Sequence, residues 1–332
     1  MTNRTAQLTR RMTAGAAMIA VPLAGIQLYL KHLAATSAAS PKPIEDSTDE
    51  ALTRLRNVDP KLIAYRDTAR FPAGVTGPRA IAVDSTGHTF VTGYNVIRIF
   101  GDASARDITL TDTPNCLTVH DSSIYLGFKD RVETYDLAGK RTETWPTLPA
   151  GSLITGIAAG ASDIYLADSG RRLVVHTDRF GKILNEIGKP DPSRDIPGIL
   201  LPSPHLNVAL APDGTIWLNN AGRHRMENYS PDGTLERFWG AYGMNVDSFI
   251  GCCNPSDFAL LSDGSFVTAE KGVFRVKHYL PDGRFDSFVA SPTAFAREIT
   301  GLKIASAPDG HIVILDRGDA TLHVFAPAGG AR

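Results

Sequence analysis

Apolar and polar residues alternate in short runs along the chain from residue 78 onward, and turn residues separate these runs at regular intervals. Alternation with a period of two predicts half-buried β-strands, and Asp-Gly or Thr-Gly pairs between two runs predict tight hairpins. Such pairs occur at Thr86-Gly87, Asp213-Gly214, Asp263-Gly264 and Asp309-Gly310. The pattern therefore predicts an all-β domain.

The strand pattern repeats six times, in copies that begin 36 to 51 residues apart. The first strand of each copy is predicted at residues 79–83, 115–119, 155–159, 206–210, 256–260 and 302–306. A turn and further short strands follow each of them. About four short strands in each repeat of this length are typical of a propeller blade, whereas helical repeats lack this alternation. The chain is therefore predicted to form a six-bladed β-propeller.

The sixth copy ends near Phe325 without a fourth strand, and an unpaired strand candidate lies upstream of the first copy, at residues 62–67. We expect this N-terminal strand to complete the last blade and to close the ring. Closure would protect a sheet edge to which other chains could otherwise add a strand.

The N-terminus carries a second pattern. Residues Met12 to Leu30 include no charged side chain, and Arg10 and Arg11 precede them. A helix of this length spans the hydrocarbon core of a bilayer, which is about 30 Å thick, and the arginines place its N-terminal end in the cytoplasm. We therefore expect a single-pass signal anchor in a bacterial inner membrane. The small residues 34–40 leave cleavage as an alternative.

This interpretation divides the chain into three parts. Residues 1–33 form the cytoplasmic stub and the transmembrane signal anchor, residues 34–60 a tether, and residues 61–332 the propeller. On this interpretation the propeller lies in the periplasm, on the extracytoplasmic side of the membrane.

Composition narrows the function further. The formal net charge is −1 and no basic cluster is present, so nothing indicates a nucleic-acid partner. Three cysteines are too few for a disulfide framework. The chain contains no Gly-x-Ser-x-Gly, no His-Glu-x-x-His and no phosphate-binding loop. These observations favour a binding module over a hydrolase.

Residues 168–182 carry a more specific pattern: an acidic residue, a glycine turn, a basic residue, an apolar strand and then Asp-x-x-Gly. It recurs from Asn220, Glu270 and Asp316, whereas the first two copies have Tyr94 and Phe128 at the acidic position. The pattern resembles NHL repeats. The resemblance covers residues 62–330 and implies a six-bladed propeller in which the acidic residue caps the following turn, but it implies little chemistry.

Aligned copies indicate a polar site at one mouth of the central channel. The innermost strands have a column of small residues, and two positions earlier the column reads Ala80, Cys116, Gly156, Asn207, Asp257 and Lys303. Converging polar groups in a concave place are candidates for ligand binding. The ligand-binding candidates are Cys116, His205, Asn207, Asp257, Glu270 and Lys303. Alternatively, these groups only satisfy backbone atoms and channel water.

The repeat is most distorted at residues 251–255, Gly-Cys-Cys-Asn-Pro. Together with its flanks, this motif resembles a subgroup of exported bacterial NHL proteins. In an oxidising compartment Cys252 and Cys253 could form a structural vicinal disulfide or a more reducible, redox-active one. In reduced form they could bind a soft metal such as copper or zinc, together with His224 or His205.

Three functions follow from these features. The first is a membrane-tethered module that binds a protein partner or a small ligand at one propeller face, for example as an accessory to a redox complex. The second is a metal-binding or thiol-redox protein that uses Cys252 and Cys253. The third is a lactonase- or lyase-type enzyme, with calcium or a similar cation held at the channel mouth by Asn207, Asp257, His205 and Glu270.

Overall fold

The computed structural model describes residues 53–101, 103–296 and 301–329. These residues belong to one compact unit, Thr53–Arg332. Within them, none of the helices has the length and apolar character needed to cross a bilayer. The expected anchor between Met12 and Leu30, and most of the expected tether, lie outside the described residues.

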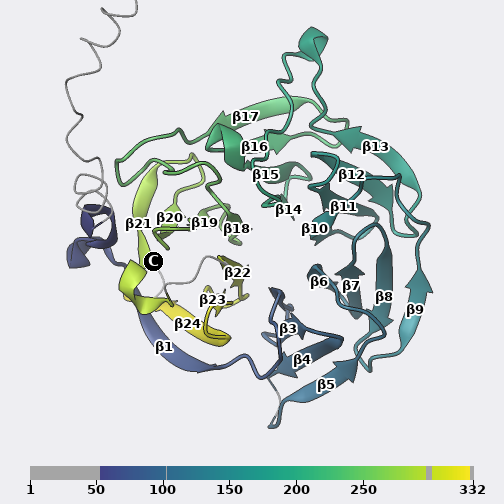
Figure 1. Ribbon diagram of the computed structural model, residues 1–332, viewed down its shortest axis with the longest axis horizontal. Helices are drawn as coiled ribbons and strands as arrows, with labels where there is room; N and C mark the ends of the chain where they lie inside the picture. Colours follow the sequence, from purple (N-terminus) through teal and green to yellow (C-terminus); the bar gives the residue numbers. More distant parts are fainter. Residues whose placement is uncertain (1–52, 102, 297–300, 330–332) are drawn as a thin grey trace, which may run out of the picture. The chain divides into compact units, whose positions relative to one another are not determined.

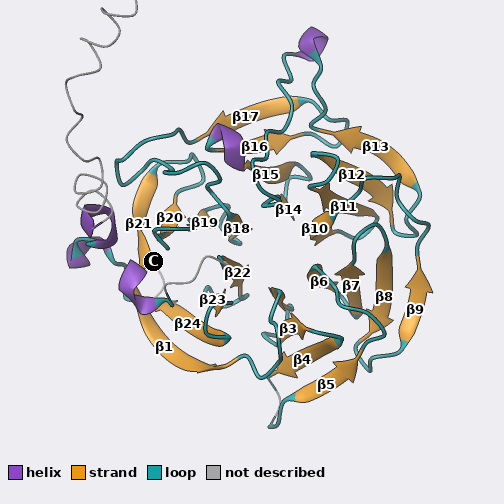
Figure 2. Cartoon of the chain, viewed as in Figure 1, coloured by secondary structure: helices purple, strands orange, loops and turns teal. Residues whose placement is uncertain are grey.

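Six antiparallel sheets of four strands each are arranged around a central axis, which confirms the predicted six-bladed propeller (Figures 1 and 2). We number the blades from the first sheet that the chain completes. Blade one contains β2 (Ala80–Val83), β3 (Thr89–Gly93), β4 (Val96–Phe100) and β5 (Arg106–Thr109), and blade two contains β6 (Cys116–His120), β7 (Ser123–Gly127), β8 (Val132–Asp136) and β9 (Arg141–Thr144). Blade three contains β10 (Ile154–Ala159), β11 (Asp163–Asp168), β12 (Leu173–Asp178) and β13 (Ile183–Ile187).

The remaining blades follow the same order from the axis outward. Blade four contains β14 (Val208–Leu210), β15 (Ile216–Asn220), β16 (Arg225–Tyr229) and β17 (Leu235–Trp239). Blade five contains β18 (Asp257–Leu260), β19 (Phe266–Ala269), β20 (Val276–Tyr279) and β21 (Phe285–Ala290). Blade six contains β22 (Leu302–Ser306), β23 (Ile312–Asp316), β24 (Thr321–Pro327) and, as its outermost strand, β1 (Tyr65–Pro72).

The turns between the first and second strands explain why the Asp-Gly pairs predict hairpins. In blades four, five and six the glycine has a positive φ of 82° to 83°, a conformation that costs little without a Cβ atom. The preceding aspartate accepts a hydrogen bond from the backbone N–H two residues later, at 2.9 to 3.1 Å. Each turn is thus held by its own side chain.

The strand expected at residues 62–67 begins later than predicted, at Tyr65, and continues to Pro72. Residues Pro60–Leu62 instead form the 3-10 helix η1, because Pro60 favours a helix start and the Asp59 carboxylate accepts a hydrogen bond from the Lys61 N–H at 3.0 Å. β1 then pairs antiparallel with β24, from Tyr65–Pro327 to Pro72–Thr321.

The apolar core is divided into six clusters, each of which lies between two neighbouring blades. Between blades four and five, for example, Trp217 and Met226 pack against Phe258 and Phe266. Between blades six and one, Leu315 and Leu322 pack with Ile81 and Val91. Each blade therefore depends on both neighbours to bury its two faces, as expected for a repeat that has no core of its own.

Candidate functional site

The channel mouth is built from residues at one end of the innermost strands. His205 and Asn207 precede β14, Asp257 begins β18, and Lys303 lies at the start of β22. Lys271 follows Glu270 at the end of the second strand of blade five, and Arg317 follows β23, the second strand of blade six. These second strands run antiparallel to the innermost ones. These side chains therefore lie at the same end of the channel.

Asp257 joins three blades at this end. Its carboxylate accepts hydrogen bonds from Asn207 Nδ2 at 2.9 Å and from the Ile304 N–H at 3.0 Å. Lys303 Nζ lies 3.4 Å from the same carboxylate. Asp257 is 1% exposed, so these partners replace its hydration. The structure brings together Asn207, Asp257 and Lys303, and it shows the carboxylate already occupied by chain donors.

A second residue that connects the segments of the mouth is Asn219, which is fully buried. It donates to the backbone oxygens of His205, at 3.1 Å, and Pro255, at 2.9 Å, and accepts the Asn207 N–H at 2.6 Å. One amide side chain thus fixes the segments that carry His205, Asn207 and the cysteine motif. It positions the site without facing a ligand itself.

His205 is a neutral imidazole at physiological pH. Burial, together with the positive charges of Lys303, Lys271 and Arg317, lowers its pKa to about 4. Such an environment disfavours an additional cation. It is suited instead to a group that carries negative charge.

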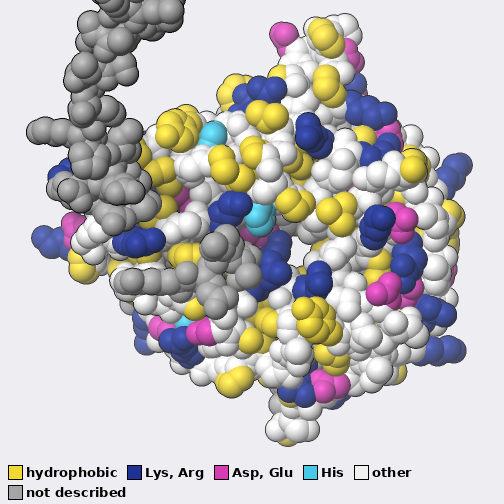
Figure 3. Space-filling view, viewed as in Figure 1, with side chains coloured by type: hydrophobic (Ala, Val, Ile, Leu, Met, Phe, Trp, Pro, Cys, Tyr) yellow, Lys and Arg dark blue, Asp and Glu magenta, His cyan; other side chains and the backbone are white. Residues whose placement is uncertain are grey.

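Two arginines extend this positive region. Burial and the nearby charge of Arg79 lower the pKa of Arg317, and Asp257 partly offsets them. Arg317 Nε donates to the Pro78 oxygen at 3.1 Å, and Arg79 donates to Asn115 Oδ1 at 3.4 Å. In the face shown in Figure 3, Lys and Arg side chains gather with a His around the central opening. The charges of Lys303, Lys271 and Arg317 thus act on His205 from one end of the channel.

The cysteine motif borders the same mouth because it leads into β18. Cys252 is exposed, Cys253 is 3% exposed, and both are thiols with their sulfur atoms 2.9 Å apart. Asn254 holds the loop: its side chain donates to the Ile250 oxygen at 2.7 Å and accepts the Lys271 N–H at 2.8 Å. The Asn254–Pro255 peptide bond is cis.

The two thiols differ in acidity. Burial opposes ionisation of Cys253, but hydrogen bonds from Cys252 and Ser203 and the charge of Lys271 outweigh it and lower its pKa. The hydrogen bond to Cys253 and burial raise the pKa of Cys252. When the pair loses one proton, the thiolate therefore forms on Cys253, next to the Lys271 ammonium group.

Three predicted site residues do not join the mouth. Cys116 is buried among Ile154, Ile157 and their neighbours, and burial raises its pKa to about 12. Glu270 bonds Arg275 and Lys277 in the interior of blade five. His224 bonds the Gly251 backbone oxygen, so it contacts the cysteine motif but not as a partner of the thiols.

Sequence reasoning missed the cations Lys271, Arg317 and Arg79. A signal was present, since Lys271 and Arg317 each follow the acidic position of their repeat, whereas Ser169 and Ala221 occupy that place in blades three and four.

The fold defines a class, the six-bladed β-propellers, and solved structures of propeller type resemble it. A streptogramin B lyase matches with a TM-score of 0.56 at 14% identity, over 79% of this chain and 97% of that one. A virginiamycin B lyase from Staphylococcus aureus matches with a TM-score of 0.52 at 13% identity, over 79% and 99%. The WD40 β-propeller domain of Doa1 matches with a TM-score of 0.52 at 11% identity, over 75% and 78%.

At these identities the likeness concerns the fold alone. No family model matches the chain, and no curated protein matches it in sequence.

Proposed function

We propose that the propeller is a binding module that holds a small anionic ligand, carrying a carboxylate or phosphate group, at the channel mouth. The observation that carries this proposal is the group of positive charges around His205, where Lys303, Lys271 and Arg317 all lower the pKa of the imidazole. Cations that converge on one concave place attract an anionic ligand.

Calorimetric titration of the full-length chain with inorganic phosphate and with succinate tests the proposal. We expect K303Q combined with R317Q to weaken binding at least tenfold, because each removes a charge from the mouth. The control is K140Q combined with R284Q, which removes two exposed charges elsewhere. Equal affinity in the two double variants, or no binding of either probe by the unaltered chain, would contradict the proposal.

The cysteine pair supports a second candidate function, a thiol-redox or soft-metal site beside the mouth. Its support is the contact of Cys253 with Ser203 and Lys271, which favours a thiolate, the reactive and metal-binding form. Thiol titration before and after reduction, together with elemental analysis, tests both versions. A full count of free thiols without bound copper or zinc would contradict them.

The lyase- or lactonase-type alternative has less support. Chain donors already occupy Asp257, and Glu270 bonds Arg275 and Lys277, so the expected cation ligands do not converge among the described residues. The lyases among the structural neighbours share the fold at 13% to 14% identity, which carries no activity to this chain.

We also propose three points about the architecture. The first is that the blades are NHL repeats, and the second is that pairing of β1 with β24 closes the ring. The last is that the segment from Met12 to Leu30 anchors the propeller outside the cytoplasm of a bacterium. The capping contacts support the first point: Asp168 accepts the Leu153 and Arg171 N–H groups at 2.8 and 3.1 Å. Protease protection of the chain in intact cells tests the last, and complete digestion only after the inner membrane is opened would contradict it.

A further inference from the structure

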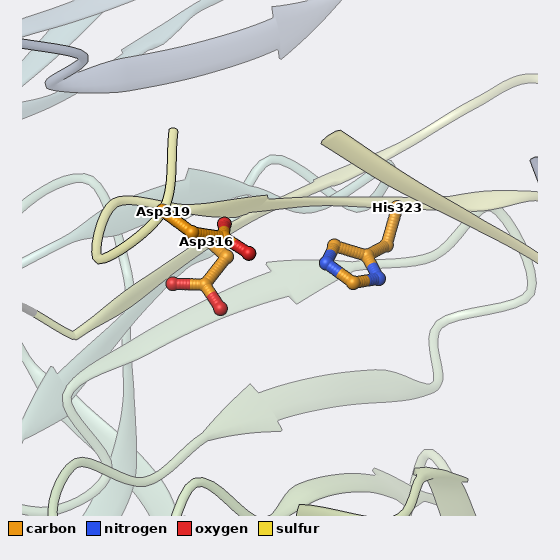
Figure 4. A group of neighbouring side chains, drawn as sticks. All are labelled: Asp316, Asp319 and His323. Carbon is orange, nitrogen blue, oxygen red and sulfur yellow. The ribbon is translucent and has the colours of Figure 1, made fainter. Parts of the chain in front are cut away.

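Blade six contains a group of metal-ligating side chains that the channel-mouth proposal does not use. Asp316, at the end of β23, and Asp319, in the following turn, lie with His323 of β24 so that one potential ligand atom from each falls within 4.8 Å of the others. Figure 4 shows an imidazole nitrogen turned toward the two carboxylates. Asp67 of β1 adds a further carboxylate, with Oδ2 at 3.8 Å from His323 Nδ1.

His323 is the unusual member of this group. Its ring is fully buried, and neither ring nitrogen has a hydrogen-bond partner among the described residues. Phe295 and Phe325 cover the ring, with centroids 5.2 and 6.1 Å away. Because a buried polar group without a partner costs about 1 to 3 kcal/mol, this imidazole needs an explanation.

A comparison of the six aligned blades provides an explanation for the buried His323 imidazole. The third strand of each blade places one buried residue opposite the residue of the second strand that lies two positions before the acidic position of the repeat: Ile97, Glu133, Val175, Glu227, Lys277 and His323. The column is apolar in blades one and three. In blades two, four and five it is charged, and each charged member has an opposite charge from the chain.

These partners are close. Glu133 lies 3.0 Å from Arg131 Nε, and Glu227 lies 2.6 Å from a nitrogen of Arg225. In blade five the order of charges is reversed: Lys277 Nζ lies 2.5 Å from Glu270, the residue at the acidic position of the repeat. Blade six keeps the acid, Asp316, which accepts the Ala296 and Gly318 N–H groups at 2.6 and 2.9 Å, but it has His323 where blade five has the ammonium group.

His323 does not replace this ammonium group as a partner of the acid, because neither of its ring nitrogens has a hydrogen-bond partner among the described residues. An imidazole nitrogen without such a partner is available to a metal ion. Arg70, which lies 2.9 Å from Asp319, neutralises one carboxylate from the surface, and its side chain is 51% exposed.

We propose that Asp316, Asp319 and His323 bind a divalent transition-metal cation of the zinc or manganese class in blade six, in the place that the Lys277 ammonium group occupies in blade five. One imidazole nitrogen with two carboxylates suits these ions better than calcium, which prefers oxygen ligands alone. The side chain of Asp319 is 34% exposed, which leaves a path for the ion and a position for water.

The site differs from the channel mouth in residues and in charge, so the two proposals fail independently. In this test, full-length protein is stripped with a chelator and titrated with ZnCl₂, MnCl₂ and CaCl₂, and thermal unfolding is measured with each ion. We expect one equivalent of Zn²⁺ or Mn²⁺ to bind and to raise Tm by at least 3 °C, with a smaller effect of Ca²⁺. The variants D319N and H323N should each weaken binding at least tenfold.

Two controls separate this site from other metal-binding groups. C252S combined with C253S should retain the bound ion, and D309N, which alters an exposed turn carboxylate of the same blade, should leave affinity unchanged. D319N keeps the test valid if H323N does not fold, because Asp319 is exposed. Absence of a Tm shift in the unaltered chain, or equal shifts in D319N and the unaltered chain, would overturn the proposal.

Discussion

Blades five and six place different residues at one buried position, and the difference shows how a repeat fold manages charge. In blade five, Glu270 faces the Lys277 ammonium group at 2.5 Å, and both side chains are fully buried. In blade six, Asp316 faces His323, whose ring nitrogens have no partner among the described residues. The backbone register of the two blades is the same. In blade five the chain itself supplies the charge that neutralises Glu270, whereas in blade six our proposal assigns this role to an external cation.

The same blades also differ in how they are assembled. Blade five takes its four strands in sequence order, whereas blade six takes its outermost strand from β1, more than 200 residues earlier in the chain. Asp67 and Arg70, which surround His323, come with that strand. The proposed ion would therefore lie beside the N-terminal strand, since Asp67 Oδ2 is 3.8 Å from His323 Nδ1.

The largest effect is expected from removing the acid of blade five. E270Q leaves Arg275 and Lys277 buried without their counter-charge, which costs about 3 to 5 kcal/mol. Burial already lowers the pKa of Lys277 to about 8, against the opposing effect of Glu270. Urea unfolding at pH 7 measures the loss, with the exposed substitution E236Q as the control. A loss below about 1 kcal/mol would show that the pair is not what neutralises blade five.

The second effect concerns pH and His205, the half-buried imidazole at the channel mouth. Because the folded pKa of His205 is about 4, against an ordinary value near 6.5, the unfolded chain takes up a proton first as the pH falls. Stability is therefore complete above pH 6.5 and falls between pH 6.5 and 4. We expect this group to account for a loss of about 2 kcal/mol, since it is partly solvated.

H205N should remove that part of the pH dependence, whereas H120N, in which the replaced side chain is 33% exposed, should not. The measurement is the free energy of unfolding from denaturant curves at pH 7 and pH 4.5. Parallel pH profiles for H205N and the unaltered chain would show that His205 does not titrate as described.

The third effect is expected when blade six receives the lysine that blade five has at the equivalent position. H323K introduces an ammonium group near Asp316 and Asp319, so the variant should fold without metal, with a stability in chelator within about 1 kcal/mol of that of the unaltered chain. Zn²⁺ should raise the Tm of the unaltered chain but not that of H323K. Stabilisation of H323K by the ion to the same extent would show that the ion binds elsewhere.

The sequence predicts the fold well because the information lies in local patterns. The six repeats, their strand order and the Asp-Gly turns depend on neighbouring residues. The start of β1 was misplaced because the alternation at residues 62–67 outweighed the helix-start signal of Asp59 and Pro60. At the channel mouth, Asn207, Asp257 and Lys303 could be predicted to meet because they share one alignment column.

The rest of the candidate sites depends on contacts that no local pattern contains. Glu270 is predicted at the mouth as an oxygen ligand, but its side chain turns into blade five toward Lys277, whereas its neighbour Lys271 bonds Ser203. The environment of His323 requires β1 to lie beside β24, a pairing between distant segments. Burial and the lack of a partner among the residues that the structure describes identify His323 as unusual, and neither can be read from sequence.

The smallest effect concerns Lys271, which stabilises an anion as the proposed ion in blade six would. Its charge lowers the pKa of Cys253, so K271Q should raise that pKa and slow alkylation at pH 7 by about threefold, with a change in stability below about 0.5 kcal/mol. The rate with iodoacetamide is best measured in a C252S background, where Cys116 does not interfere because burial raises its pKa to about 12. K140Q in the same background is the matched control. If K271Q and K140Q react at equal rates, then the Ser203 hydroxyl alone stabilises the thiolate, and the positive charge of the mouth does not extend to the cysteine motif.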